Sequence, residues 1–309
     1  MPELPDVVVY LEALAPRVLG QPLLRARLAS PFLLRSVRPP LSSAEGRRVI
    51  GLRRLGKRLV FALEGELFLV LHLMIAGRLR WKPAAGASAA PAAVPGKVGL
   101  AAFDFPTGTL LLTEASAKKR AGLHLVAGEA GLAAHDRGGL EVLDATAEAF
   151  RAALTAETHT LKRALTDPRI LSGIGNAYSD EILHRAQLSP FKRTTDLTGE
   201  ESAALLAAAQ AVLGEWTDRL RAETGEGFPE KVTAFRSGMA VHGRYGQPCP
   251  RCGTPVQRIL YAANEANYCP TCQTGGRLLA DRVLSRLMKE DWPRTLEELE
   301  EKKERGRLG

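Results

Sequence analysis

Four cysteines stand in two C-x-x-C pairs, and the chain has no other cysteine. The pairs Cys249/Cys252 and Cys269/Cys272 are separated by 16 residues, a spacing typical of two metal-binding knuckles on one β-hairpin. Zn²⁺ binds thiolates in a tetrahedron, and four protein ligands leave no open coordination position. The pattern therefore predicts a ribbon with one structural zinc ion; four free thiols or two disulfides are the alternative. Such ribbons occur in many functional classes, so the pattern does not predict an activity.

The composition is that of a globular protein, with 309 residues of which 45% are hydrophobic and 25% are charged. At roughly 150 residues per domain, the length predicts two domains and leaves room for a small third one. The longest uncharged apolar run, residues 67–76, is shorter than the about 20 residues that cross a bilayer. Residues 1–30 also lack the pattern of a signal peptide. We therefore expect a soluble cytoplasmic protein with no membrane partner.

The net charge is +8, from 42 Lys and Arg against 34 Asp and Glu. A surplus of this sign favours a polyanionic partner, and nucleic acid is the commonest polyanion that proteins bind. The alternative is that the excess charge only keeps the chain in solution. The charge alone does not decide between the two.

The hydrophobic pattern changes along the chain. Apolar residues follow helical spacing from Val8 to Val18 and again over residues 145–223. Between about residues 22 and 127 they form short β-type runs, at 49–52, 59–63, 67–73, 110–113 and 123–126. Short runs separated by Gly and charged residues are typical of an antiparallel sandwich or barrel. The sequence thus predicts an α+β multidomain chain: an N-terminal β-sandwich (1–135), a helical domain (145–240), the zinc ribbon (241–275) and a C-terminal helical extension (276–309).

Local signals predict several boundaries. The low-complexity stretch Pro83–Gly96 predicts a surface loop. Thr198 with Glu201 forms a capping box that predicts the start of an alanine-rich helix. Apolar positions from Leu278 to Met288 follow helical spacing and predict a helix that packs back on the protein.

The N-terminus carries a potential nucleophile. Methionine before a small residue is usually removed, which would leave Pro2 with a free secondary amine. An α-amine has a pKa of about 7.7–8, so part of it is neutral at physiological pH. Such an amine can attack an aldehyde-level carbon and form an iminium. The alternative is that Pro2 is an ordinary N-terminal residue.

Four features in order resemble the formamidopyrimidine-DNA glycosylase/endonuclease VIII family. They are the opening hexapeptide MPELPD, Lys57 in a predicted hairpin, the segment Leu161–Pro190 with its GIGNAYSDEIL run, and the four-cysteine ribbon. The resemblance extends from Met1 to about Cys272 and implies a base-excision repair enzyme. It implies an N-terminal β-sandwich, a helix–two-turn–helix DNA-binding domain and a zinc finger, with DNA in a basic cleft between them.

The resemblance also implies roles for individual residues. Pro2 would attack C1′ of the damaged nucleotide, expel the base and form a Schiff base, after which β,δ-elimination would cut the strand. Glu3 would act as acid and base at the sugar ring, with Asp6 as the second acidic residue, one methylene shorter than the usual Glu. Lys57, the fourth catalytic residue, would contact DNA phosphate near the lesion and assist base release. Lys162 and Asn176 would contact DNA phosphates. Asn176 also lies at the start of a predicted helix, where free amides favour an anion.

The residues that fill the space of the flipped base differ from the usual family pattern. The family's strand commonly carries Met as a wedge, whereas Ile75 occupies that position here and Met74 precedes it in the position of a Gly. Apolar side chains of this kind do insert between bases. The alternative is that Ile75 and Met74 are ordinary strand core.

Two further departures concern the loop that probes the opposite base and the zinc finger. Lys119 and Arg120 keep the charge of that loop, but Ala121 stands where the aromatic wedge is expected. Asn264 replaces the finger's usual arginine; Arg258 or Arg277 are candidates to take its place. We therefore expect retained lyase chemistry, with discrimination of the opposite base that is weaker or built from other residues.

The sequence as a whole predicts a monomeric bifunctional DNA glycosylase/AP lyase that acts on double-stranded DNA with a damaged base or an abasic site. Oxidised purines of the formamidopyrimidine and 8-oxoguanine type are the favoured lesions, and oxidised pyrimidines are the alternative. A non-catalytic protein that senses damage on the same scaffold is a second alternative. An unrelated zinc-ribbon protein would leave the opening hexapeptide and Leu161–Pro190 unexplained.

Overall fold

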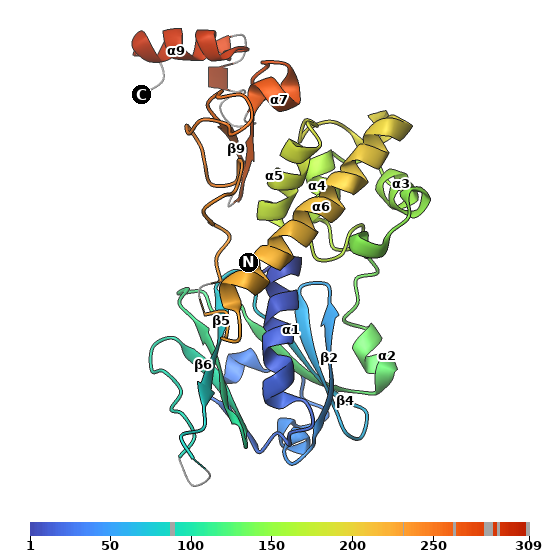
Figure 1. Cartoon of the computed structure of the whole chain (residues 1–309), viewed down its shortest axis with the longest axis vertical. Coiled ribbons are helices and arrows are strands. Elements are labelled where there is room, and N and C mark those ends of the chain that lie inside the picture. The colour runs from blue at the N-terminus through green and yellow to red at the C-terminus, as the bar shows by residue number, and fades with distance from the viewer. Residues whose placement is uncertain (87–89, 231, 262–263, 281–286, 289–290, 307–309) are drawn as a thin grey trace. The chain divides into compact units, whose positions relative to one another are not determined.

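The computed structural model describes residues 1–86, 90–230, 232–261, 264–280, 287–288 and 291–306. The chain forms two compact units (Figure 1). The first unit comprises Met1–Gly139 with Gly214–Ala234, and the second comprises Leu140–Leu213 with Phe235–Gly309. Helix α6 (Gly199–Thr224) contributes residues to both units. The four-part domain division stays a prediction, because compact units need not coincide with domains.

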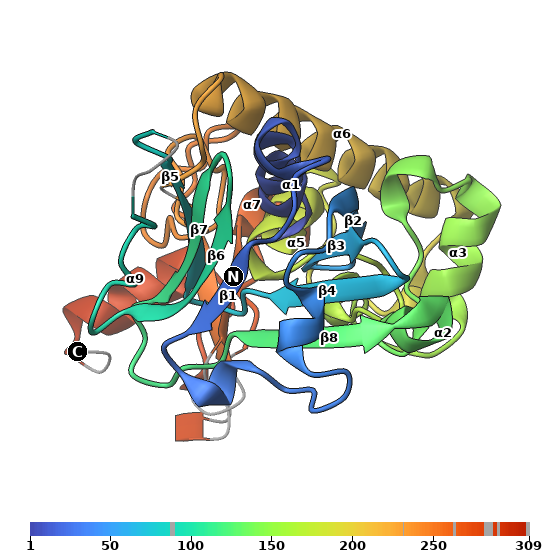
Figure 2. The ribbon, with the colours of Figure 1, turned by 90° about the horizontal axis from the view of Figure 1, so that it is seen from below.

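The first unit contains two four-stranded antiparallel sheets (Figure 2), as the short apolar runs predicted. Their strand orders are β2-β3-β4-β8 and β1-β6-β7-β5. The strands are β1 (Arg25–Leu28), β2 (Val49–Leu55), β3 (Arg58–Leu63), β4 (Leu67–His72), β5 (Gly77–Pro83), β6 (Gly99–Phe105), β7 (Gly108–Glu114) and β8 (Gly122–Ala127). The pattern did not predict β1, β5 and β6.

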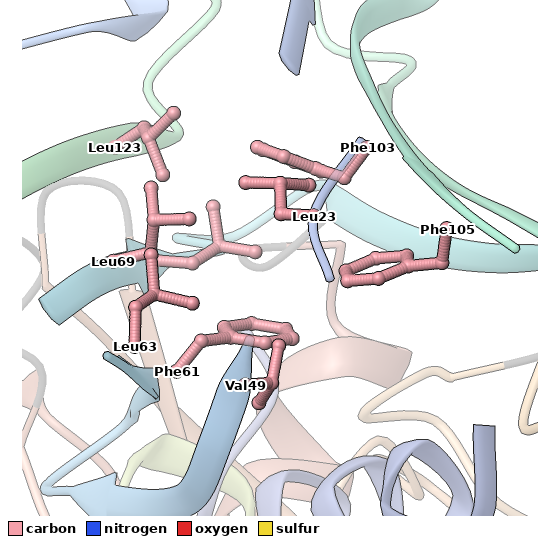
Figure 3. Close-up of a pocket in the computed structure, with 9 residues that line it drawn as sticks. Leu23, Val49, Phe61, Leu63, Leu69, Phe103, Phe105 and Leu123 are labelled. Carbon is pink, nitrogen blue, oxygen red and sulfur yellow. The ribbon is translucent and has the colours of Figure 1, made fainter. Parts of the chain in front are cut away.

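The core of the first unit lies between the two sheets (Figure 3). Phe61 and Leu69 from one sheet meet Phe103 and Phe105 from the other, and all four are buried. Burying a side chain of this size stabilises the fold by about 1.5–3 kcal/mol. The cavity left among them measures about 10 Å³. This interior is therefore filled with side chains and offers no room for a substrate.

The sheet with β3 is also covered on its outer face. Val60 and Val70 of β3 and β4 pack there against Leu132 of α2 (Gly128–Ala133). Because side chains alternate between faces along a strand, a strand buried on both faces reads as a continuous apolar run. This explains why β3 is apolar from Leu59 to Leu63.

Helix α1 (Leu4–Val18) confirms the predicted N-terminal helix. Leu4, Val7 and Leu14 are completely buried, so this face of the helix completes the core. The last turns of α6 lie beside α1, where Arg221 forms an ion pair of 2.6 Å with Glu12. Arg17 of α1 donates to the carbonyl oxygens of residues 226 and 227 at 2.9 and 3.0 Å. These contacts hold α1 against the segment that follows α6.

The second unit is helical, as predicted, and contains α3 (Ala147–Thr155), α4 (Leu161–Thr166), α5 (Asn176–Arg185) and the first part of α6. The two glycines at the start of the GIGNAYSDEIL run, Gly173 and Gly175, lie in the segment between α4 and α5. The predicted capping box is present: the Glu201 amide donates to Thr198 Oγ1 at 3.1 Å, and the Thr198 amide donates to Glu201 Oε2 at 2.9 Å. Short 3₁₀ turns lie at Pro31–Leu33 and Leu41–Ala44 in the first unit and at Val142–Asp144 and Thr194–Asp196 in the second.

The remainder of the second unit contains a hairpin of β9 (Gln257–Tyr261) and β10 (Asn264–Tyr268), followed by α7 (Pro270–Thr274). Helix α9 (Leu296–Glu304) begins after Thr295, whose Oγ1 accepts from the Glu298 amide at 3.3 Å. Most of the helix predicted from Leu278 to Met288 lies outside the described residues, as do residues 87–89 of the predicted loop. Among the described residues, no helix has the length and hydrophobicity to span a membrane.

Candidate active site and zinc site

The first residues enter α1 directly, and Pro2, Glu3 and Asp6 are buried. The Glu3 backbone N–H donates to Asp6 Oδ2 at 2.8 Å. The Asp6 carboxylate thus satisfies an amide at the helix start, and its negative charge is favourable near the positive end of the helix dipole. Three of the four predicted catalytic residues therefore belong to one buried segment at the start of α1.

The N-terminal amine lies among charged groups of the same unit. Burial lowers the pKa of the Met1 amino group; Glu3 and Asp6 raise it, and Arg78 and Lys57 lower it. An amine with a lowered pKa is more often neutral at physiological pH, and only the neutral form is a nucleophile. Met1 precedes Pro2 in this structure, so Pro2 presents this amine only after Met1 is removed.

Lys57 lies in the two-residue turn between β2 and β3, as the sequence predicted. Gly56 has a φ of 60° in the left-handed region, which allows the tight reversal. The Arg54 guanidinium donates to the Gly56 carbonyl at 2.8 Å and fixes the turn. The turn brings Lys57 near the N-terminal amine, on which its charge acts.

The turn between β4 and β5 presents Ile75 to solvent. Its side chain is 58% exposed, so Ile75 is not strand core. Met74 has a φ of 52°, a strained conformation for a residue other than glycine. Arg78 donates to the carbonyl oxygens of Ile75 at 3.1 Å and Gly77 at 2.7 Å, and these bonds fix the turn. The exposure of Ile75 agrees with a wedge, and its contact with DNA stays a prediction.

The loop before β8 is organised by Glu114. Its carboxylate accepts from the backbone amides of Arg120 at 3.0 Å and Ala121 at 3.1 Å, and Lys119 donates to the Glu114 carbonyl oxygen. Ala121 is only 3% exposed and belongs to the core. The residue in the place of the aromatic wedge therefore faces inward, and the roles of Lys119 and Arg120 at DNA stay predictions.

Lys162, a predicted phosphate contact, is buried in the second unit. Its ammonium donates to Asp180 Oδ1 at 2.5 Å, to Ser179 Oγ at 2.7 Å and to the Asn176 carbonyl oxygen at 2.8 Å. These three bonds use all the protons of the ammonium. Lys162 therefore offers no free proton to phosphate in this structure, and its phosphate contact stays a prediction.

Asn176 is the first residue of α5, close to the position that the sequence predicted. Its side-chain amide donates to the Glu265 carbonyl oxygen of β10 at 2.8 Å. This bond ties the start of α5 to the zinc-finger hairpin. Asn176 thereby has a structural partner that the sequence did not reveal, and its phosphate contact stays a prediction.

The sequence did not predict the buried polar network that joins α5 to residues 240–242. Asp180 Oδ2 lies 2.8 Å from His242 Nδ1, and the Glu181 carboxylate accepts from the backbone amides of residues 240–242 at 2.6–2.9 Å. Burial raises the pKa of Glu181, and these amides oppose the shift. Asp180 and Glu181 belong to the GIGNAYSDEIL run, so a signal was present. Their partners lie about 60 residues later in the chain, and no pattern in the sequence relates the two segments.

The four cysteines come together at the ends of the β9–β10 hairpin, and their sulfur atoms lie within 4.8 Å of one another. Cys249 Sγ lies 4.0 Å from Cys272 Sγ, and Cys252 Sγ lies 3.4 Å from Cys269 Sγ. Zn–S bonds of about 2.3 Å in a tetrahedron place sulfurs at such separations. His184 Nε2 lies 3.2 Å from Cys249 Sγ and can orient that thiolate. The donor set fits one structural zinc ion and confirms the prediction.

The replacement of the finger's usual arginine is only partly visible. Arg258 of β9 lies over the Tyr245 ring, 4.4 Å from its centroid, and forms an ion pair of 3.7 Å with Glu265. Arg277 is exposed after α7. The side chain of Asn264 lies outside the described part of the chain. The replacement of the arginine by Arg258 or Arg277 stays a prediction.

Three family models match the chain in order. Residues 1–118 match the formamidopyrimidine-DNA glycosylase N-terminal domain, residues 140–221 match the corresponding H2TH domain, and residues 246–275 match the zinc finger found in FPG and IleRS. The formamidopyrimidine-DNA glycosylase of Thermus thermophilus is 35% identical over 281 residues, which cover 89% of this chain and all of the relative. Residues 276–309 lie beyond the matched domains.

Solved structures give the same result. The crystal structure of a MutM (Fpg) protein from Thermus thermophilus has a TM-score of 0.71 and 34% identity, covering 88% of this chain and 98% of that one. A Lactococcus lactis Fpg variant in complex with Fapy-dG-containing DNA has a TM-score of 0.75 and 25% identity, covering 88% and 100%. The domain order, the N-terminal segment and the four-cysteine site described above agree with these matches, and the chain belongs to the formamidopyrimidine-DNA glycosylase family.

Proposed function

We propose that this chain is a bifunctional DNA glycosylase/AP lyase of base-excision repair that acts on double-stranded DNA with a damaged base or an abasic site. The observation that carries the proposal is the buried start of α1, where Pro2, Glu3 and Asp6 lie at the N-terminus on which the charge of Lys57 acts. The named relatives, which match nearly the whole chain, support the same activity. We propose that the protein acts as a monomer in the cytoplasm.

The first chemical step forms the Schiff base. After removal of Met1, the lone pair of the Pro2 nitrogen attacks C1′, and the C1′–N bond to the damaged base breaks with its electron pair leaving on the base. The base gains a proton, and the Pro2 nitrogen loses its own. Glu3, held by its position before α1, protonates O4′ as the sugar ring opens and leaves an iminium between C1′ and Pro2.

The second step cuts the strand. The iminium acidifies the C2′–H bond, because the electron pair left by the proton delocalises to the nitrogen. Loss of that proton expels the 3′-phosphate by β-elimination, and a further proton loss expels the 5′-phosphate by δ-elimination. Lys57 stabilises the negative charge of a phosphate near the lesion. Hydrolysis of the remaining imine releases Pro2.

The zinc site contributes structure and takes part in no chemical step. When bound, the ion holds the ends of the β9–β10 hairpin through Cys249, Cys252, Cys269 and Cys272. The bond from Asn176 to β10 then joins the hairpin to the start of α5. The zinc finger thereby supports the helix terminus that is proposed to face phosphate.

Oxidised purines are the favoured lesions. The support comes from the relatives, which are named for formamidopyrimidine, and from the Lactococcus lactis protein, which binds Fapy-dG-containing DNA. The inward-facing Ala121 leaves the loop before β8 without an aromatic wedge, so we expect weak discrimination of the base opposite the lesion. Ile75 is proposed to enter the space that the flipped nucleotide leaves.

Borohydride trapping tests the proposal. Protein shown by mass spectrometry to begin at Pro2 is incubated with duplexes carrying 8-oxoguanine, an oxidised pyrimidine or an abasic site. We expect a covalent adduct that is lost in Met1-retaining protein and in Pro2→Gly, and that forms best with the oxidised purine among the two damaged bases. No adduct from correctly processed protein that binds the DNA would favour the non-catalytic sensor.

A further inference from the structure

Helix α5 lies beside the zinc finger, and its contacts with the finger follow one helical face (Figure 1). Asn176, Asp180 and His184 are spaced four residues apart, which places their side chains on the same side of the helix. Asn176 and Asp180 both contact β10. Just after α5, the Leu188 carbonyl oxygen accepts from Gln273 Nε2 of α7 at 2.9 Å. The helix is therefore joined to the finger along its whole length.

His184 is the member of this face that contacts a cysteine of the zinc site. Its Nε2 lies 3.2 Å from Cys249 Sγ, and both side chains are buried. A zinc-bound cysteine is a thiolate without a proton, so the hydrogen of this contact belongs to Nε2. The contact is therefore an N–H···S bond, and its donor stands 65 positions before the cysteine in the chain.

The supply of hydrogen-bond donors to the sulfurs shows why this bond matters. Cys269 Sγ accepts from the Cys272 backbone amide at 3.5 Å, within its own C-x-x-C turn. In the part of the chain that the structure describes, His184 is the only nitrogen or oxygen donor to Cys249 Sγ. Four thiolates around Zn²⁺ leave an excess of negative charge, and buried charge without hydrogen bonds is unfavourable. The imidazole N–H offsets part of this charge at Cys249.

We propose that His184 is a positioning residue of the zinc site, through which zinc binding and the docking of α5 on the finger stabilise each other. The proposal takes the zinc site as given and does not depend on the proposed lyase activity. Because coupling between two equilibria is reciprocal, one bond between helix and thiolate contributes equally to both. Groups that hydrogen-bond to a metal ligand in this way change metal affinity by about 10–100-fold.

NMR of the cadmium-substituted wild-type protein tests the bond directly. Cd²⁺ takes the place of Zn²⁺ between the thiolates, and its nuclear spin couples to a proton that is hydrogen-bonded to a ligating sulfur. We expect a coupling between the metal nucleus and Hε2 of His184. Absence of this coupling overturns the proposal. A direct coupling of the metal to the Nε2 nitrogen also overturns it, because His184 would then be a ligand itself.

Zinc affinity in three variants provides a second measurement. His184→Leu removes the donor, and His184→Gln keeps a terminal N–H. His159→Leu is the control, because it removes a histidine of the same unit whose Nε2 lies 2.9 Å from Glu157. Competition with a chromophoric chelator should give a zinc affinity about 10–100-fold lower for His184→Leu. We expect most of the affinity in His184→Gln and all of it in His159→Leu. Equal affinities for the two leucine variants contradict the proposal.

Hydrogen exchange tests the reciprocal effect on α5. With zinc at a saturating concentration, the α5 amides near His184 should exchange faster in His184→Leu than in wild-type protein. The factor should be similar to the one lost in zinc affinity. An unchanged exchange rate together with reduced zinc affinity contradicts the coupling. Faster exchange with unchanged zinc affinity assigns His184 to helix packing alone and also overturns the proposal.

A leucine variant that fails to fold still leaves the proposal testable. The cadmium coupling is measured in the wild-type chain and decides whether the N–H···S bond exists. His184→Asn, whose shorter side chain withdraws the N–H from Cys249, then replaces His184→Leu in the affinity and exchange measurements. The same reductions are expected for it, and wild-type values in both measurements contradict the proposal.

Discussion

The backbone amide of Glu3 donates to the Asp6 carboxylate at 2.8 Å, across one turn of α1. This bond fixes the backbone of Glu3, the proposed catalytic acid, at the start of the helix. It gives Asp6 a positioning role that needs no contact with the sugar. The shorter side chain of Asp, compared with the usual Glu of the family, is sufficient for this bond. Glu3 and Pro2 are thereby held in fixed orientation before the helix.

Substitution of Asp6 separates positioning from direct catalysis. Asp6→Ala removes the acceptor, so we expect a loss of about 1 kcal/mol in the free energy of unfolding and a larger relative loss in the rate of borohydride trapping. Asp6→Asn keeps an acceptor oxygen and should retain most of both. Urea unfolding and single-turnover trapping measure the two effects. An Asp6→Asn protein as inactive as Asp6→Ala would show that the charge itself is required.

Lys162 and Asp180 test whether the second unit depends on a buried ion pair. Lys162→Met leaves the Asp180 carboxylate buried beside His242, and breaking such a pair costs about 3–5 kcal/mol in the free energy of unfolding. The matched control is Lys192→Met, which breaks a more exposed pair with Glu201 and should cost about 0–1 kcal/mol. Equal stabilities, with DNA affinity reduced only in Lys162→Met, would instead assign Lys162 to phosphate.

Much of the fold could be predicted from local patterns. Short apolar runs predicted β2, β3, β4, β7 and β8, since each packs apolar side chains on the core. The strand β1 was missed because it is a four-residue edge strand with two arginines. The strand β5 alternates Leu79 and Trp81 with charged residues beside a low-complexity stretch, and Ala-rich β6 resembles a loop or helix as much as a strand.

The site residues could be predicted where they form short contiguous motifs in the sequence. Pro2, Glu3 and the cysteine pairs carry their chemistry in short motifs, and the structure gathers Glu3, Asp6 and Lys57 around the N-terminal amine. The partners of Lys162 and Glu181 could not be predicted, because burial and pairing depend on how α5 meets distant segments.

Ile75 can be tested as a wedge because its removal should not disturb the fold. The side chain is 58% exposed, so Ile75→Ala should change the free energy of unfolding by no more than about 0.5 kcal/mol. We expect severalfold weaker binding to an abasic duplex and little change for Ile75→Met. Ile50→Ala is the control, since Ile50 is 64% exposed in β2. The same affinity for Ile75→Ala and Ile50→Ala would exclude the wedge.

Zinc removal should unfold the hairpin and weaken DNA binding. Metal analysis should give one zinc ion per chain, and structural sites of this type contribute about 10–16 kcal/mol of apparent binding free energy in finger peptides. Cys269→Ala should lose the metal and much of the DNA affinity. Thr271→Ala, which removes only a hydroxyl contact between the knuckles, should keep both. Unchanged DNA affinity in metal-free protein would contradict the structural role of zinc.

The mostly buried imidazole of His72 in β4 predicts how stability depends on pH. The folded pKa of His72 is about 4, below its ordinary value of 6.5, so the unfolded chain binds more protons between these values. Stability contributed by neutral His72 is therefore present above pH 6.5 and is lost as pH falls toward 4, by at most about 3 kcal/mol. Urea unfolding from pH 4.5 to 7.5 measures it. His72→Gln should flatten this dependence, whereas His159→Gln, in the second unit, should keep it. Parallel curves for both variants would contradict the assignment to His72.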